Sequence, residues 1–330
     1  MLMRSEASQS AEAVDVPDLV RAGVVGDPVA HSLSPVMHRA ACRVLCVPLR
    51  YDAHRAPAGA LEPLLHDLAE DPRWRGLSVT MPHKADAARL ADACSDRVAL
   101  LNAANTLVVG HPEAPEHGRF GPGLWAHNTD VDGIVHALNG GLGASKQRCG
   151  SAGRPSSLKG ATVGVIGNGG TATAAVLASS LLGAAAVSIY ARSARRAAAV
   201  LELAGRCGLA AEHRPVEAVA AEAPGLGAVV STLPPHAADG LAGSVTAAMC
   251  AVPPVLLDVA YDPWPSALAQ AWADRGGEVV SGRAMLVGQG IEQVRLFTGL
   301  ELGPSGSEST AGRRRAAALA AMEHAVGEAP

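Results

Sequence analysis

Short apolar runs alternate with longer amphipathic stretches along most of the chain, a pattern typical of α/β proteins. The runs are rich in Val, Ile and Leu and short enough to be buried strands. They predict strands at residues 20–25, 77–80, 105–109, 162–166, 186–190, 228–232, 255–259 and 279–281. The spacing of apolar residues between them predicts helices at residues 35–46, 82–94, 128–138 and 283–299. Because strands and helices alternate, we expect mainly parallel sheets.

Three segments lack such patterns. Residues 110–123 are polar and rich in Pro and Gly, which predicts a hairpin. Residues 139–159 are rich in Gly and Ser, which predicts a surface loop beside a domain boundary. Residues 304–330 form an Ala-rich tail for which the pattern specifies little structure.

The longest uncharged run, residues 161–191, is long enough to cross a bilayer. However, five glycines interrupt it, and Thr and Ser are scattered through it. It divides into a strand, a glycine turn, a helix and a second strand, which predicts a buried unit of a parallel sheet instead of a membrane span. The polar residues 1–18 contain no apolar signal segment, so we expect no export and a cytoplasmic location.

Composition limits the possible classes of protein. At 330 residues with 48% hydrophobic side chains, the chain is long enough for two domains, each with its own core. A net charge of −4, with only 4 Trp, 3 Tyr and 2 Phe, argues against a nucleic-acid binder. The six cysteines form no C-x-x-C pair and the twelve histidines no H-E-x-x-H pattern, so we expect reduced thiols and no metal site.

A glycine turn follows the predicted strand at 162–166 and precedes an Ala-rich helix; its residues are Gly167, Asn168, Gly169, Gly170 and Thr171. Glycines let the backbone approach a pyrophosphate closely, and the helix N-terminus offers free N–H groups to it. A tight turn also needs glycine for its own sake. The strand–turn–helix context favours dinucleotide binding.

The segment after the next strand carries Arg192, Ser193, Arg195 and Arg196 and no acidic residue. An acid here would accept the ribose 2′-hydroxyl of NAD, whereas arginines and a serine suit the 2′-phosphate of NADP. The alternative is a solvated basic helix start, although cations in a first helical turn oppose the helix dipole. We therefore predict NADP as the cofactor.

Three further motifs combine polar groups with helix starts. Ser34 before Pro35 predicts an N-cap followed by the first helical residue, and with Ser32 it also forms a possible carboxylate cradle.

Lys84 falls in a first helical turn, where the helix dipole disfavours its charge. This position suits a proton carrier, although a surface lysine is equally compatible. Asp130 lies in an Asn-Thr-Asp segment whose spacing does not fit a calcium loop, because Asn139 stands where that loop needs Glu. Stabilisation of its own helix is the alternative role for Asp130.

Together and in this order, the motifs resemble those of the shikimate dehydrogenases, over roughly residues 22–299. The resemblance implies a catalytic pair, Lys84 and Asp130. It implies substrate contacts at Ser32, Ser34, Thr80, Asn105, Tyr261 and Gln289. It implies cofactor contacts at Asp96, Gly167, Asn168, Gly169, Gly170, Thr171, Arg192, Ser193, Arg196, Thr232, Val259 and Gly282. Ser78 stands where the family usually has Asn.

The resemblance also implies a layout and a reaction. A disordered tail (1–17) would precede a discontinuous substrate domain (18–128 and 284–326), with a Rossmann-type NADP-binding domain (129–283) inserted and the active site in the cleft between them. The reaction would be NADPH-dependent reduction of 3-dehydroshikimate to shikimate, in aromatic amino-acid biosynthesis, by a monomer or homodimer. A quinate or aminoshikimate dehydrogenase and a non-catalytic ligand sensor are the alternatives.

Overall fold

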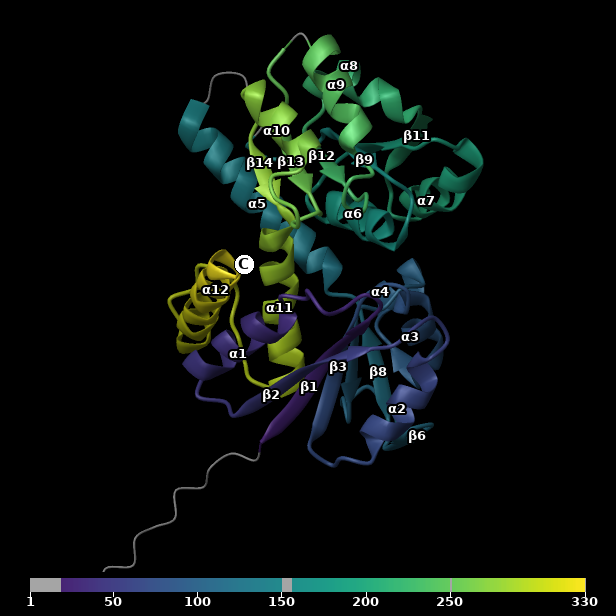
Figure 1. Cartoon of the computed structure of the whole chain (residues 1–330), viewed down its shortest axis with the longest axis vertical. Helices are drawn as coiled ribbons and strands as arrows, with labels where there is room; N and C mark the ends of the chain where they lie inside the picture. The colour runs from purple at the N-terminus through teal and green to yellow at the C-terminus, as the bar shows by residue number, and fades with distance from the viewer. Residues whose placement is uncertain (1–18, 150–155, 250, 330) are drawn as a thin grey trace, which may run out of the picture.

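Two six-stranded sheets organise the chain in the computed structural model, which describes residues 19–149, 156–249 and 251–329 (Figure 1). The predicted disordered tail, residues 1–17, lies outside the described residues. Each sheet belongs to its own α/β domain, and the two domains lie end to end along the long axis of the molecule (Figure 1). The two-domain α/β prediction is confirmed.

The sheet of the first domain has the order β2-β1-β3-β5-β8-β4. Its strands are β1 (Val20–Gly26), β2 (Leu49–Arg55), β3 (Trp74–Val79), β4 (Ala93–Cys94), β5 (Thr106–Val109) and β8 (Leu124–His127). Only β5 runs antiparallel to its two neighbours, so the sheet is mainly parallel, as predicted. The predicted hairpin at 110–123 contains the antiparallel pair β6 (His117–Gly118) and β7 (Gly121–Pro122).

The sheet of the second domain is entirely parallel, with the order β11-β10-β9-β12-β13-β14. Counted within the domain this is the order 3-2-1-4-5-6 of the doubly wound dinucleotide-binding fold. Its strands are β9 (Thr162–Ile166), β10 (Ala186–Tyr190), β11 (Ala210–Arg214), β12 (Ala228–Ser231), β13 (Val255–Asp258) and β14 (Val279–Ser281). The uncharged run is therefore β9, a turn, a helix and β10, as predicted.

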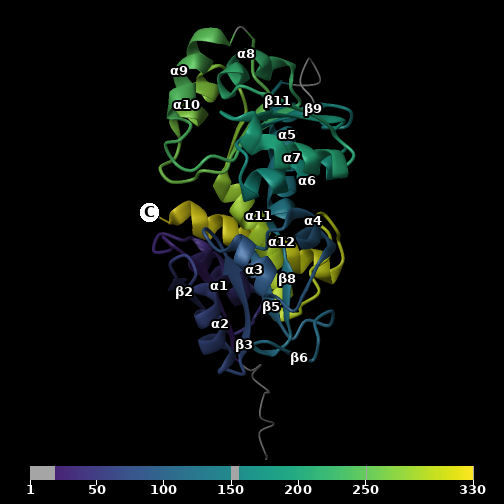
Figure 2. The same ribbon diagram turned by 90° about the vertical axis from the view of Figure 1, so that its right-hand side faces the viewer.

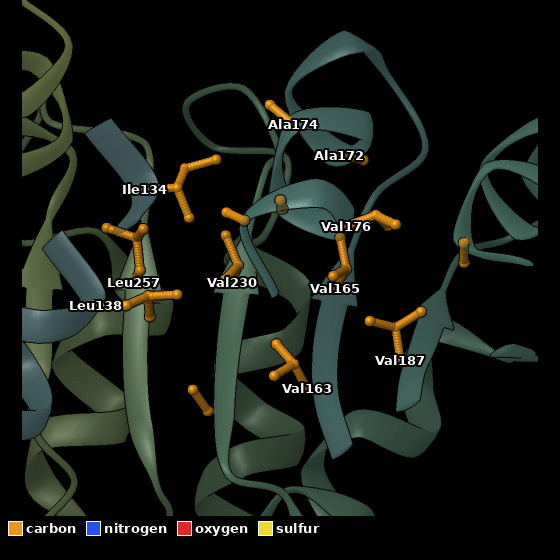
Figure 3. Packing of buried hydrophobic residues seen from close by; sticks show 14 of the residues in the cluster. Ile134, Leu138, Val163, Val165, Ala172, Ala174, Val176, Val187, Val230 and Leu257 are labelled. Carbon is orange, nitrogen blue, oxygen red and sulfur yellow. The ribbon is translucent and has the colours of Figure 1, made fainter. Parts of the chain in front are cut away.

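Helices cover both faces of this sheet. They are α6 (Gly170–Leu181), α7 (Ala194–Arg206), α8 (Val219–Glu222), α9 (Asp239–Ala248) and α10 (Ala267–Asp274), with the short 3-10 turns η1 (Val216–Ala218) and η2 (Ala223–Gly225). Figure 3 shows one side of the core, where Val165 of β9 and Val230 of β12 face the small side chains of α6. The abundance of Ala lets these helices lie close to the sheet.

Two long helices, α5 (Asp130–Cys149) and α11 (Gly282–Thr298), join the domains and pack against each other (Figures 1 and 2). Their contact depends on glycine. A Cβ on Gly133 would lie 2.4 Å from the Met285 carbonyl oxygen, and one on Gly288 would lie 2.6 Å from the His136 Cβ. Because real Cβ contacts are never this short, a larger residue would push the helices apart.

The first domain also contains α1 (Ser34–Val44), α2 (Leu61–Ala69), α3 (Lys84–Leu90), α4 (Asp96–Leu101) and α12 (Thr310–Glu328). Residues 304–330, for which the sequence pattern specified little structure, contain the long helix α12. Helix α12 lies beside α1 and α11 (Figure 1), and Met322 packs with Met37 and Ile291. Packing against α1 and α11 stabilises this helix, because its own sequence carries only a weak amphipathic pattern.

Two other boundaries also differ from the prediction. The prediction of a loop at 139–159 is wrong for residues 139–149, because α5 continues to Cys149. Residues 150–155 lie outside the described residues. The helix at 82–94 is shorter than expected, because α3 ends at Leu90 and β4 follows. Within the described residues, no helix has both the length and the hydropathy needed to cross a bilayer.

Candidate active site

A cavity of about 460 Å³ opens between the two domains. The first domain contributes Ser32, Ser34, Thr80 and Lys84 to its wall, and the second contributes Thr171, Thr232, Val259 and Tyr261. Asp130, Gly282 and Gln289 line it from the joining helices α5 and α11. Eleven of the residues predicted for substrate, catalysis or cofactor therefore meet in one space.

Lys84 and Asp130 form an ion pair in this cavity. The Lys84 Nζ lies 2.6 Å from Asp130 Oδ2, and the two side chains are only 19% and 6% exposed. Each residue is the first of its helix, α3 for Lys84 and α5 for Asp130. The N-terminus of α5 stabilises the carboxylate, and the carboxylate in turn stabilises the lysine charge that the start of α3 disfavours. The pair places a proton donor at the cavity wall.

Asn105 holds the other side of the Asp130 carboxylate. Its Nδ2 donates to Asp130 Oδ1 and to Gln289 Oε1, both at 2.8 Å, and its Oδ1 accepts from the Thr129 backbone N–H at 2.7 Å. Asn105 is 2% exposed and lies behind the cavity wall. It therefore fixes Asp130 and Gln289 and does not itself line the space.

The predicted carboxylate cradle lies at the start of α1. Ser32 and Ser34 both line the cavity, together with His31, which the sequence patterns did not single out. The predicted N-cap role of Ser34 is wrong, because α1 begins at Ser34 and Leu33 is the N-cap, without a side-chain hydrogen bond. Instead, Ser32 Oγ accepts from the Ser34 backbone N–H at 3.3 Å.

A second cavity of about 430 Å³ adjoins the first, since Leu233 lines both. It lies over the carboxyl ends of β9 and β10 and is lined by Gly167, Asn168, Arg192, Ser193 and Arg196, among others. This is the place where a doubly wound sheet binds dinucleotides. Of the predicted cofactor residues, five line this second cavity and four line the first, namely Thr171, Thr232, Val259 and Gly282.

The glycine turn leaves open space for a ligand. Gly167 has φ +115°, and a Cβ there would lie 2.4 Å from Thr232 Oγ1. By contrast, a Cβ on Gly169 or Gly170 would meet no atom within 4 Å, so the space beside the start of α6 is free. A side chain at either position would fill the room that a pyrophosphate needs.

The basic segment also fits a phosphate. Arg192 and Arg196 are exposed, and neither has a carboxylate within ion-pair distance in the part of the chain that the structure describes. Ser193 is the N-cap of α7 and accepts from the Arg196 backbone N–H at 3.4 Å. The residues of the second cavity therefore fit NADP.

Three predicted cofactor residues line neither cavity: Gly169 and Gly170, which border the open space beside the start of α6, and Asp96. Asp96 is exposed at the start of α4. Tyr261 does line the first cavity, and burial raises the pKa of its phenol, which keeps it protonated at neutral pH. No cluster of three or more His, Cys, Asp or Glu side chains suited to a metal ion occurs among the described residues.

The sequence patterns missed a group of buried polar side chains: Gln293, which lines the cavity, and Tyr51, Thr106 and Thr129, which lie behind its wall. Gln293 lies one helical turn after Gln289, so the helical spacing on α11 was a signal that could have found it. Tyr51 carries no such signal, because it reaches the site only through the pairing of β1 with β2.

A doubly wound nucleotide-binding domain, an open cleft and a lysine–aspartate pair in that cleft define a dinucleotide-dependent oxidoreductase. The family model of the shikimate dehydrogenase substrate binding domain matches residues 24–107. The shikimate dehydrogenase (NADP(+)) of Methylobacterium radiotolerans is 34% identical over 279 residues, which are 82% of this chain and 88% of that protein. The chain belongs to the shikimate dehydrogenase family.

Solved structures agree with this placement. A shikimate 5-dehydrogenase from Mycobacterium fortuitum matches with a TM-score of 0.70 and 38% identity, covering 92% of this chain and 98% of that one. A shikimate 5-dehydrogenase from Thermus thermophilus, solved in complex with NADP(H) and shikimate, matches with a TM-score of 0.67 and 28% identity over 93% and 99% of the two chains.

Proposed function

We propose that this protein catalyses the reversible NADP-dependent interconversion of 3-dehydroshikimate and shikimate, a step of aromatic amino-acid biosynthesis. The observation that supports it most is the Lys84–Asp130 ion pair, 2.6 Å long, in a cavity that also adjoins the dinucleotide pocket. The relatives named above support the identity of the substrate and the cofactor. A cytoplasmic location and a monomeric or homodimeric state stay predictions from the sequence.

The proposed arrangement divides the work between the domains. Residues 18–128 and 284–326 would bind the substrate, and residues 129–283 would bind NADP. Ser32 and Ser34 would hold the substrate carboxylate, because two hydroxyls beside the start of α1 face the same cavity. Thr80, Tyr261 and Gln289 would contact the ring from other sides, and Arg192 and Arg196 would hold the 2′-phosphate of NADP.

Lys84 would act as the proton donor and acceptor at the reacting oxygen of the substrate. NADPH, when bound, supplies the two electrons and one hydrogen that the carbonyl carbon needs. Lys84 Nζ would donate a hydrogen bond to the carbonyl oxygen and then a proton as negative charge develops there. In the reverse direction the same amine would accept the hydroxyl proton.

Asp130 would keep that amine in place. One carboxylate oxygen accepts from Lys84 and the other from Asn105, so the carboxylate cannot turn away without losing a hydrogen bond. The closed network also leaves Lys84 with hydrogens for the substrate oxygen, since an ammonium has three donors. Thr232, Val259 and Gly282 would form the wall beside the nicotinamide.

Steady-state kinetics test this proposal directly. We expect kcat/KM to be highest for shikimate with NADP among four combinations of shikimate or quinate with NADP or NAD. A higher value for quinate would support a quinate dehydrogenase instead. Folded protein that binds shikimate in calorimetry but turns over none of the combinations would support the non-catalytic sensor.

A further inference from the structure

Tyr51, Ser78 and Gln293 form a buried chain of hydrogen bonds at the wall of the substrate cavity. We infer that Tyr51 and Gln293 are positioning residues that fix the Ser78 hydroxyl so that only its acceptor side faces the cavity. Ser78 would then select a substrate hydroxyl that donates to it. This inference rests on the proposed function, because it concerns how the same cavity recognises its substrate.

The three side chains come from separate elements and meet in the core. Tyr51 of β2 donates from its hydroxyl to Ser78 Oγ at 2.6 Å, and Ser78 of β3 donates to Gln293 Oε1 of α11 at 2.8 Å. Tyr51 and Gln293 are 0% exposed and Ser78 is 4% exposed. Ser78 and Gln293 line the substrate cavity, whereas Tyr51 lies behind them.

The orientation of the Gln293 amide follows from its neighbours. Its Nε2 lies 3.2 Å from the Asn105 carbonyl oxygen, which can only accept a hydrogen bond, and 3.0 Å from Thr106 Oγ1. The amide nitrogen must therefore face Asn105, and the amide oxygen must face Ser78. The Ser78 hydrogen is thus committed to Gln293.

The Tyr51 hydroxyl then completes the arrangement. Because the Ser78 hydrogen is already used, Ser78 can only accept from Tyr51. Burial raises the pKa of Tyr51, so its phenol keeps the hydrogen that it donates. Ser78 Oγ has one hydrogen and two lone pairs, of which the hydrogen and one lone pair are occupied. One acceptor position remains.

A free serine hydroxyl rotates and can donate or accept, so it distinguishes poorly between ligand groups. The fixed hydroxyl of Ser78 accepts only and would favour a ligand hydroxyl over a ligand carbonyl or ether oxygen at that point. Gln289, which lines the same cavity, has the opposite polarity: its Oε1 is held by Asn105, which leaves its Nε2 as a donor. An acceptor and a donor on one wall suit a hydroxyl-bearing ring.

A double-mutant cycle tests whether Tyr51 and Gln293 act through Ser78. Ser78→Ala is expected to raise the KM for shikimate roughly five- to tenfold, the effect of one lost hydrogen bond. Tyr51→Phe and Gln293→Met are each expected to raise it roughly two- to fivefold, with smaller changes in kcat and no change in the KM for NADP. In the Ser78→Ala background, Tyr51→Phe is expected to add nothing.

The matched control is Ser179→Ala in α6. Ser179 is fully buried, its hydroxyl donates to the Ala175 carbonyl at 2.7 Å, and it lines neither cavity. This variant loses a buried hydroxyl of the same kind and should keep the wild-type KM for shikimate. Thermal melts establish that each variant folds; if Gln293→Met does not, the Tyr51→Phe cycle carries the test.

The outcomes separate the inference from the proposed function. Loss of the Tyr51→Phe effect in the Ser78→Ala background supports the inference. Additive effects, or equal losses in shikimate and NADP kinetics, assign Tyr51 and Gln293 to general packing and overturn it. An unchanged KM in Tyr51→Phe overturns it while the proposed function stands. Wild-type protein that does not oxidise shikimate overturns the proposed function and the inference with it.

Discussion

The two sides of the cleft recognise their ligands by different physical means. On the substrate side, Asn105, Asp130 and Gln293 are buried, and their polar atoms are held by other protein groups. On the cofactor side, Arg192 and Arg196 are exposed, and Gly169 and Gly170 border open space. The polar groups of the substrate side are thus held in place by the protein before a ligand binds. On the cofactor side, the exposed arginines and the glycine backbone have no such protein partners, and a bound ligand must order them.

The difference has energetic consequences. A buried polar group without its partner costs more than an exposed one, because water cannot replace the partner. Substitutions on the substrate side should therefore affect catalysis and stability strongly and depend little on salt. Substitutions on the cofactor side should affect one ligand, leave stability nearly unchanged and depend on ionic strength, since exposed charges are screened.

The largest effect is expected for Lys84→Ala. Loss of a general acid lowers kcat by about 10²–10⁴-fold, because the developing charge on the oxygen finds no proton donor. Calorimetry should still detect shikimate binding, since the other wall residues remain. Lys146→Ala, which removes an exposed lysine from α5, is the control and should keep the wild-type kcat. A Lys84→Ala variant with wild-type kcat would exclude Lys84 as the proton carrier.

The double variant Arg192→Ala, Arg196→Ala should come next. Each charge-assisted hydrogen bond to the 2′-phosphate contributes about 1.5–3 kcal/mol, so the KM for NADP should rise at least tenfold. The KM for NAD and the KM for shikimate should change little. Arg206→Ala, at the other end of α7, is the matched control. Equal losses for NADP and NAD would contradict the assignment of these arginines to the 2′-phosphate.

The contact between the joining helices provides a third test. Gly133→Ala is expected to lower the free energy of unfolding by about 1–3 kcal/mol, because its Cβ would overlap the Met285 carbonyl oxygen. Gly140→Ala in the same helix meets no atom within 4 Å and is expected to stabilise the protein by about 0.5–1 kcal/mol. Urea unfolding of both variants measures the difference, and equal effects would show that the α5–α11 contact is not close-packed.

Acid should lower the stability of the folded protein, and buried His38 is one cause. Burial lowers the pKa of His38 to about 4, below the value of 6.5 for an exposed histidine. Between these values the unfolded chain takes up a proton that folded His38 does not, so stability is present above pH 6.5 and falls as the pH decreases. The loss from pH 7 to pH 5 is about 2 kcal/mol for this histidine. Unfolding of His38→Gln at both pH values should show a smaller loss; an equal loss would contradict the prediction.

The sequence predicted the parallel sheets well, because a buried strand has a distinct composition. Strands β9, β10 and β14 occur at the predicted residues, each an apolar run next to turn residues. Strand β2 was missed, because its edge position lets charged residues such as Arg50 and Asp52 alternate with Tyr51. Helix α12 was missed because packing on α1 and α11 stabilises it more than its own sequence does.

The candidate site divides in the same way. Lys84, Asp130 and the glycine turn lie in local motifs with their own chemistry, so the sequence identified them, and the structure places them around two adjoining cavities. Tyr51 and Gln293 could not be identified in this way. Their roles depend on the meeting of β2, β3 and α11, which no local pattern describes.

The most direct test of the central claim is the absorbance of NADPH after the protein is mixed with NADP and shikimate. The proposed function predicts that absorbance at the NADPH band rises with wild-type protein. It predicts a rate lower by about 10²–10⁴-fold with Lys84→Ala that still binds shikimate. A flat trace from folded wild-type protein would contradict it.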